Sequence, residues 1–196
     1  MNQDNLDYLK NSMKFFGFSD KLNESLEIKI KEQPDAFQLT LKGEFKKDNN
    51  LKNVDYVLDF KKSSTTDMYF FNRYLATLNT GNPEADKSQT FYITKGNSGV
   101  TAKEAFNLLD GRAVNKDLIG KDGQPFNAWL QLNFNEREEN GNFKVKQFHS
   151  NYKFDLEAAV SKHPIKELGN EDDKTKLMKS LEKGNLQSVT YVLDGR

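Results

Sequence analysis

A tryptophan on the polar side of a predicted strand is the feature of this sequence that most strongly suggests binding chemistry. Residues 127–134 read N-A-W-L-Q-L-N-F, so the apolar side chains alternate with a second set that includes Trp129 and Gln131. A polar turn follows, and the return segment F-K-V-K-Q-F-H brings Lys144, Lys146 and His149 beside the tryptophan. Aromatic and cationic side chains on one sheet face are typical of protein interfaces, and this face therefore predicts a contact surface for a partner.

A glycine pair ahead of a helix start is the second candidate site. Gly96 and Gly99 precede T-A-K-E, a capping box in which Thr101 and Glu104 each satisfy a free N–H group. Unpaired N–H groups at such a position can hold a phosphate or a carboxylate, so Gly96, Gly99 and Thr101 are candidate anion-binding residues. The full phosphate-binding motifs G-x-x-x-x-G-K-[ST] and G-x-G-x-x-G are absent. A simple turn before a well-capped helix is the favoured interpretation.

Two basic residues follow that helix and form the third candidate site. Arg112 and Lys116 could clamp an anion, with Trp129 as a stacking platform. Acidic residues interleave with these bases and would pair with them locally; they are Asp110, Asp117 and Asp122. A solvated loop held by salt bridges of Arg112 is therefore the favoured interpretation.

The sequence offers little for catalysis or for metal binding. It has no Cys and only two His, which excludes disulfides, thiol catalysis and cysteine-ligated metal sites. Neither H-E-x-x-H nor G-x-S-x-G occurs. His163 precedes Pro164 at an expected helix end and His149 lies in an expected strand, where a structural or surface role is the usual one. We expect no catalytic residue, no bound metal and no cofactor.

The composition is typical of a water-soluble globular protein. The 196 residues are 36% hydrophobic and 12% aromatic, which suits one domain with an aromatic core. Lys+Arg and Asp+Glu both number 29, and this balance argues against a dedicated nucleic-acid binder because phosphate neutralisation needs a basic surplus. The sequence has no apolar run that could span a membrane and no signal-peptide pattern at its start. These features predict a cytoplasmic protein without a membrane partner.

Hydrophobic periodicity predicts an α+β fold, with a mostly antiparallel sheet of six to seven strands and about four packed helices. Helical spacing occurs in residues 6–16, 22–30, 101–109, 155–163 and 170–183. Strand patterns occur in residues 37–45, 54–60, 68–78, 91–93, 127–134, 143–149 and 186–193. The segment 68–78 carries aromatic residues at both parities, which predicts a central strand covered on both faces.

The chain is expected to form a single α+β domain over residues 1–196. The alternative is two lobes, 1–95 and 96–196, divided between Gly81 and Gly99. The helix-then-strand pattern of residues 20–45 is repeated in residues 171–193, so an internal duplication is a further alternative. Antiparallel meanders also produce such echoes by patterning alone.

Several long segments give the chain a resemblance to a family. They are T-A-K-E-A-F-N-L-L-D-G-R-A-V-N-K-D-L, F-N-A-W-L-Q-L-N-F, V-K-Q-F-H-S-N-Y, P-I-K-E-L and S-L-E-K-G-N-L-Q-S-V-T, with D-M-Y-F-F-N-R-Y-L-A-T-L and S-Q-T-F-Y-I nearer the start. The chain resembles an uncharacterised bacterial domain family of unknown function, whose members often accompany conjugative or other mobile genetic elements. The resemblance covers most of the chain and implies a bacterial, intracellular setting. It assigns no catalytic or binding role to any residue.

Together these patterns predict a non-enzymatic binding or accessory module whose partner is another protein. The alternative is a nucleic-acid-associated protein that uses a local basic and aromatic face; the bases concerned are Arg112, Lys116, Lys121, Lys144 and Lys146. A weaker alternative is an enzyme or binder of a phosphorylated small molecule at residues 96–101.

Overall fold

The structure is a computed structural model that describes residues 2–47, 50–93, 99–120 and 122–192. These residues form an α+β fold with two antiparallel sheets. The α-helices are α1 (Gln3–Phe15), α2 (Asn23–Glu32), α3 (Ala102–Leu109), α4 (Leu156–Val160) and α5 (Glu171–Glu182). The strands are β1 (Ala36–Lys47), β2 (Asn50–Lys62), β3 (Tyr69–Asn79), β4 (Lys87–Tyr92), β5 (Val114–Ile119), β6 (Pro125–Arg137) and β7 (Phe143–His149). The predicted fold class is confirmed.

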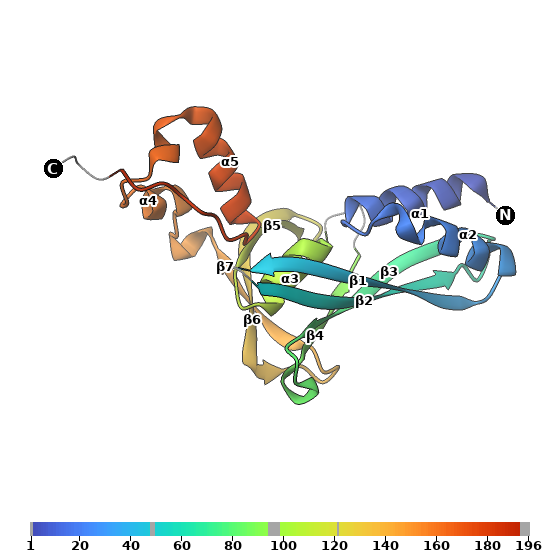
Figure 1. Cartoon of the computed structure of the whole chain (residues 1–196). Coiled ribbons are helices and arrows are strands. Elements are labelled where there is room, and N and C mark those ends of the chain that lie inside the picture. The colour runs from blue at the N-terminus through green and yellow to red at the C-terminus, as the bar shows by residue number, and fades with distance from the viewer. Residues whose placement is uncertain (1, 48–49, 94–98, 121, 193–196) are drawn as a thin grey trace.

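The larger sheet is a four-stranded meander in the order β1-β2-β3-β4, with α1 and α2 on one of its faces (Figure 1). Strand β2 shows why one face is buried, because its apolar side chains have period two. Val54, Tyr56, Leu58 and Phe60 are buried against the helices, and the residues between them are only half-buried. A sheet of this kind can leave its second face in water.

The prediction that β3 is covered on both faces is wrong. The register passes from the Asp59–Arg73 pair to the Phe60–Phe71 pair, so Asn72 is the extra residue of a β-bulge. A bulge shifts the parity of the strand by one residue. The helical face consequently buries three aromatic residues of β3, Tyr69, Phe71 and Tyr74, and Phe70 is exposed on the other face. Strict period-two alternation would instead divide these aromatic residues between the two faces.

The smaller sheet has the order β5-β6-β7, and α3 packs on its aliphatic face between the two sheets (Figure 1). Residues 114–119 were expected to lie in a loop but form β5, because their register places Val114 against Leu130 of β6. The predicted last strand, 186–193, is wrong for its described residues, where only Tyr191 bridges to Ile165. The echo between residues 20–45 and 171–193 therefore has no counterpart strand after α5.

Two buried amides join the sheets edge to edge. The side chain of Gln89 on β4 bonds the backbone N and O of Phe143 at 2.8 and 3.3 Å. Asn142 returns the same pattern to the N and O of Thr90 at 2.9 and 3.4 Å. Asn142 thus supplies the edge of β4 with the backbone partner that an additional strand would provide, and Gln89 does the same for Phe143 at the start of β7. The two sheets are thus held in a fixed relation without sharing a strand.

One hydrophobic cluster runs from α1 through the four-stranded sheet and α3 to Phe143. Buried tyrosines tie α3 to this core, since Tyr56 and Tyr74 donate their hydroxyls to the carbonyls of Ala102 and Val100 at 2.7 and 2.6 Å. Burial raises the pKa of both phenols, so they remain protonated donors.

The C-terminal helices extend away from both sheets (Figure 1). Asn107 of α3 anchors them, donating to the carbonyl of Lys183 at 2.6 Å and to Oδ1 of Asn185 at 3.0 Å. Gly184 lies close against this joint at a φ of +74°, and a Cβ there would stand 2.7 Å from the carbonyl of Ala113. This segment forms one wall of the candidate site.

Candidate functional site

Trp129 lies on the face of the small sheet that points away from α3. Its register partners are Asn115 on β5 and Phe148 on β7, and paired residues of an antiparallel sheet share a face. Ala128 and Leu130, its neighbours in sequence, are buried on the opposite face. The predicted parity of β6 is therefore correct, and the indole itself is half-buried.

An apolar hollow of about 440 Å³ opens beside the indole. Its walls come from the sheet, from the segment after β7 and from α4 and α5; they are Ala113, Trp129, Phe148, Tyr152, Phe154, Leu156 and Leu181. Phe154 meets Trp129 edge to face at 5.5 Å, and Tyr152 meets Phe148 in the same way at 5.2 Å. Edge-to-face contacts of this kind fix ring orientation, so the hollow has a defined aromatic lining.

Local structure after β7 turns these aromatic residues toward the sheet. A 3₁₀ turn at Ser150–Tyr152 is followed by Lys153, which adopts a left-handed φ of +52°. Asp155 then caps α4, with its side chain accepting from the N–H of Ala158 at 2.9 Å. This reversal brings Phe154 back over Trp129 while leaving its ring 56% exposed.

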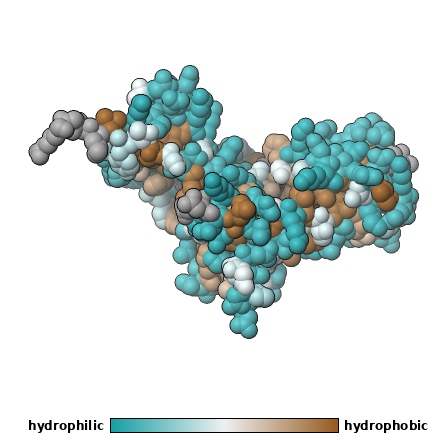
Figure 2. Space-filling view, in the orientation of Figure 1, coloured by the Kyte–Doolittle hydropathy of each residue, from teal (hydrophilic) through white to brown (hydrophobic). Residues whose placement is uncertain are grey.

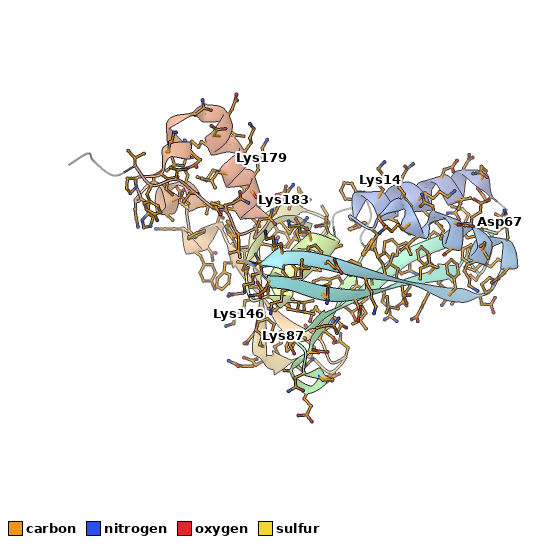
Figure 3. All side chains as sticks on the ribbon, viewed as in Figure 1. Lys14, Asp67, Lys87, Lys146, Lys179 and Lys183 are labelled. Carbon is orange, nitrogen blue, oxygen red and sulfur yellow. The ribbon has the colours of Figure 1, made fainter. Side chains whose placement is uncertain are left out.

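One unpaired lysine lies beside the hollow. Lys146 of β7 is two residues from Phe148 and shares its sheet face, and it forms no ion pair within the described residues. Lys179 and Lys183 lie one turn apart at the C-terminal end of α5 (Figure 3), on the side opposite Leu181, and Lys183 lines a separate hollow with Thr101 and Glu104. An apolar depression beside an unpaired cation favours an apolar group that carries negative charge nearby.

Two further predicted residues share the Trp129 face. Gln131 pairs with Lys146 in register and donates to the carbonyl of Gly111 at 3.3 Å. Lys144 forms an exposed ion pair of 2.8 Å with Glu136, and that hydrogen bond raises the pKa of Lys144. Lys144 is thus already engaged, and neither residue lines the hollow.

The placement of His149 on this face is wrong. His149 pairs with Ala128, and it lies on the opposite face of the sheet, where its ring is tilted by 43° against that of Phe126 with 5.2 Å between the ring centroids. The reason is parity, because an odd-numbered residue of β7 stands opposite an even-numbered residue of β6.

Arg112 and Lys116 do not form an anion clamp with Trp129. Arg112 approaches Asp110 to 3.2 Å in an ion pair without hydrogen-bond geometry, and its guanidinium lies over the ring of Phe106. Burial lowers the pKa of Arg112, and Asp110 partly offsets this. Lys116 points to the other face of the sheet and pairs with buried Glu104 at 3.1 Å. The predicted salt bridge of Arg112 is present, and both bases serve packing around α3.

The proposed anion site at the start of α3 has few free donors. The N–H of Thr101 donates to the Glu104 carboxylate, the N–H of Glu104 donates to the Thr101 hydroxyl, and the N–H of Ala102 donates to the carbonyl of Phe16. The predicted capping box is confirmed. Gly99 is buried, and a Cβ there would stand 2.8 Å from the Phe16 ring, so close packing explains this glycine. Gly96 lies outside the described residues, as does Lys121.

The described residues contain no group of three His, Asp or Glu side chains placed to hold a metal ion. His149 and His163 lie against aromatic rings, Phe126 and Tyr191 respectively.

Sequence reasoning missed most of the lining of the hollow. Phe148 could have been found, because it is the register partner of Trp129 once the hairpin is aligned. Tyr152 and Phe154 alternate in S-N-Y-K-F, a signal of one-sided apolar character just beyond the strand. Leu156 and Leu181 reach the site through the packing of α4 and α5, for which the sequence holds no local signal.

Comparisons with known proteins add no further identification: no family model, no curated protein and no solved structure matches this chain. Among the described residues, no helix combines the length and the apolar character needed to cross a membrane.

Proposed function

We propose that this protein is a non-enzymatic binding module that captures a partner protein through the aromatic hollow beside Trp129. The observation that carries the proposal is the hollow itself, about 440 Å³ in volume with seven apolar or aromatic lining residues. Its volume lies within the range of about 300–1,000 Å³ that is usual for binding pockets. A single large apolar side chain of a partner would fill much of it, as anchor residues do at protein interfaces.

The chemistry around the hollow defines the partner segment. Lys146 leaves one unpaired positive charge on the sheet face beside the hollow, so the segment should carry Asp or Glu near its anchor side chain. The hollow offers few polar groups at its centre, which favours a Phe or Leu anchor over a polar one. The partner is thus an acidic peptide segment with one large apolar anchor.

The setting of this function is part of the proposal. The resemblance to a bacterial domain family that accompanies mobile genetic elements supports an accessory role in the cytoplasm of a bacterial cell. Nucleic-acid binding gains less support, because Arg112, Lys116 and Lys144 are engaged with Asp110, Glu104 and Glu136. Among the described bases, Arg112, Lys116 and Lys144 thus have acidic partners of their own.

A titration with labelled peptides tests the proposal. Fluorescein-labelled peptides with a central Phe or Leu flanked by Glu are added to the protein, and anisotropy is recorded. Saturable binding is expected for these peptides and not for peptides with Ala at the anchor or Lys in the flanks. Phe154→Ala should weaken binding at least about tenfold, since an anchor contact is worth more than about 1.4 kcal/mol.

Matched variants supply the controls. Phe15 on α1 is 56% exposed, the same fraction as Phe154, and Phe15→Ala should leave peptide affinity unchanged. Lys14 lies on α1 far from the hollow, and Lys14→Glu should have little effect where Lys146→Glu weakens binding (Figure 3). The proposal would be rejected if each variant at the hollow lost no more peptide affinity than its control on α1. It would also be rejected if no peptide with a Phe or Leu anchor bound saturably.

A further inference from the structure

A second hollow lies on the uncovered face of the four-stranded sheet. It has a volume of about 600 Å³ and is lined from all four strands; the lining residues are Ala36, Phe37, Gln38, Asp59, Phe60, Lys61, Asn72, Arg73 and Tyr92. The surface viewed in Figure 2 is mostly hydrophilic, with apolar side chains in separate patches. This second hollow is polar at its centre, unlike the one beside Trp129.

A row of cross-strand partners holds one guanidinium at the centre of this hollow. Gln38 donates to Oδ1 of Asp59 at 2.6 Å, and Nε of Arg73 donates to Oδ2 of the same carboxylate at 2.6 Å. Asp59 therefore fixes Arg73 through the Nε side of the guanidinium. Tyr92 hydrogen-bonds the same guanidinium from β4, and no described carboxylate other than that of Asp59 lies within ion-pair distance of it. An arginine oriented in this way presents a planar pair of donors that matches a carboxylate or a phosphate.

The residues around Arg73 add charge and a ring. Lys61 forms no ion pair within the part of the chain that the structure describes, so the hollow holds two cations and the single acid Asp59. Tyr92 is the register partner of Arg73 and is 54% exposed, and after Asp59 its phenol contributes to raising the pKa of Arg73. Asn72 adds a side-chain amide from the bulge, a feature that often re-aims a side chain beside a binding site.

We propose that this hollow binds a small molecule carrying a carboxylate or a phosphate on a planar ring. Arg73 receives the anion through its Nη groups, Lys61 supplies a second positive charge, and Tyr92 provides an aromatic surface for the ring. Asp59 and Gln38 position Arg73 and do not contact the ligand. This site is independent of the Trp129 hollow, which lies on the other sheet.

Phenyl phosphate and benzoate are suitable probes. Each is titrated into the full chain, and binding is monitored by chemical-shift changes in two-dimensional amide NMR spectra. Both should give saturable shifts confined to the strands of this hollow, with dissociation constants on the order of millimolar for ligands of this size. Inorganic phosphate, which lacks the ring, and benzyl alcohol, which lacks the charge, should both bind more weakly. Binding of inorganic phosphate as tight as that of phenyl phosphate would overturn the ring requirement.

Variants separate a specific site from general charge attraction. Arg73→Gln should weaken both probes at least about tenfold, because charge-assisted hydrogen bonds are lost. Lys42→Gln removes a cation from the same sheet face outside the hollow, and it should change affinity less than about twofold at roughly 0.15 M salt. Tyr92→Leu should weaken the ring-bearing probes alone. A dispersed spectrum of each free variant establishes that it is folded.

The inference is overturned if neither probe gives saturable shifts at this hollow. It is equally overturned if Arg73→Gln and Lys42→Gln reduce affinity to the same extent, since the anion would then respond only to net charge.

Discussion

The two sheets each turn one face away from the shared core, and these two faces carry opposite chemistry. On the four-stranded sheet, one row of cross-strand partners is polar, and Gln38, Asp59 and Arg73 hydrogen-bond one another along it. On the three-stranded sheet, Trp129 pairs with Phe148, and this aromatic pair presents apolar surface that is stabilised when other side chains pack over it. The segment after β7 supplies part of that cover through Tyr152 and Phe154.

This difference shows how one type of sheet can provide two kinds of site. A polar ladder leaves a face that is stable in water and offers a few directed donors, which select a small charged ligand. An aromatic pair leaves apolar area that is only partly covered, and a partner gains free energy by completing the cover.

The largest effect is expected where the two regions are joined. Replacing Gln89 by Leu leaves the N and O of Phe143 without partners in a buried position, which should cost about 2–4 kcal/mol of unfolding free energy. Chemical denaturation of Gln89→Leu measures this cost. Gln147→Leu on exposed β7 is the matched control and should cost less than about 0.5 kcal/mol. Equal costs would mean that the amide joint does not hold the sheets together.

A smaller difference in stability should separate one aromatic residue on each face, Trp129 and Tyr92. Trp129→Ala should lower the unfolding free energy by about 2 kcal/mol, because removing a half-buried ring costs only part of what removing a fully buried ring costs. Tyr92→Ala removes a ring that is 54% exposed and should cost less than about 1 kcal/mol. Thermal or denaturant unfolding of both variants tests the contrast. A greater loss of unfolding free energy for Tyr92→Ala than for Trp129→Ala would mean that the face with Tyr92 is the more closely packed of the two, contrary to this account.

The polar row itself should contribute little to stability. A double-mutant cycle between Asp59 and Arg73 should give a coupling of about 0.2–1 kcal/mol, since the pair is partly exposed and screened. A coupling well above this range would assign the row a structural role and would remove the reason to regard Arg73 as a ligand donor.

The weakest effect is local and depends on pH. The carboxylate of Glu167 accepts from the N–H of Thr190, and this hydrogen bond lowers the pKa of Glu167 below its ordinary value of 4.5. A carboxyl group whose pKa is lower in the folded than in the unfolded state stabilises the folded form above pH 4.5. This contribution to the unfolding free energy is lost as the pH falls through the folded-state pKa. The protection factors for amide exchange should therefore fall around Thr190 in acid before they fall in either sheet. Glu167→Gln should remove the pH step, and an unchanged step would assign it to another group.

Much of the fold follows from local signals. The alternation in β2 and β6 fixes which faces are buried, and the capping box at Thr101 fixes the start of α3. Two elements depend on partners far away in sequence. The bulge at Asn72 reverses the parity of β3, and β5 becomes a strand only because β6 lies beside it. Residues 186–192 have a strand-like pattern but no neighbouring strand to pair with, so they form only the isolated bridge between Tyr191 and Ile165.

The candidate site was predictable to a similar degree. Trp129 could be placed on its face by parity alone, because β6 is regular through Asn133. The error with His149 arose because the register between two strands depends on the turn that joins them. Phe154, Leu156 and Leu181 could not be assigned to the site, since only the packing of the C-terminal helices brings them to Trp129.

Quenching of Trp129 fluorescence tests the central claim most directly, because Trp129 is the only tryptophan in the chain. An open aromatic hollow beside the unpaired Lys146 predicts that iodide quenches the emission and that caesium does so much less. Lys146→Glu should narrow this difference between the two ions, and Lys14→Glu should leave it unchanged. Emission that resists both ions would place the indole in a sealed interior and would contradict the account.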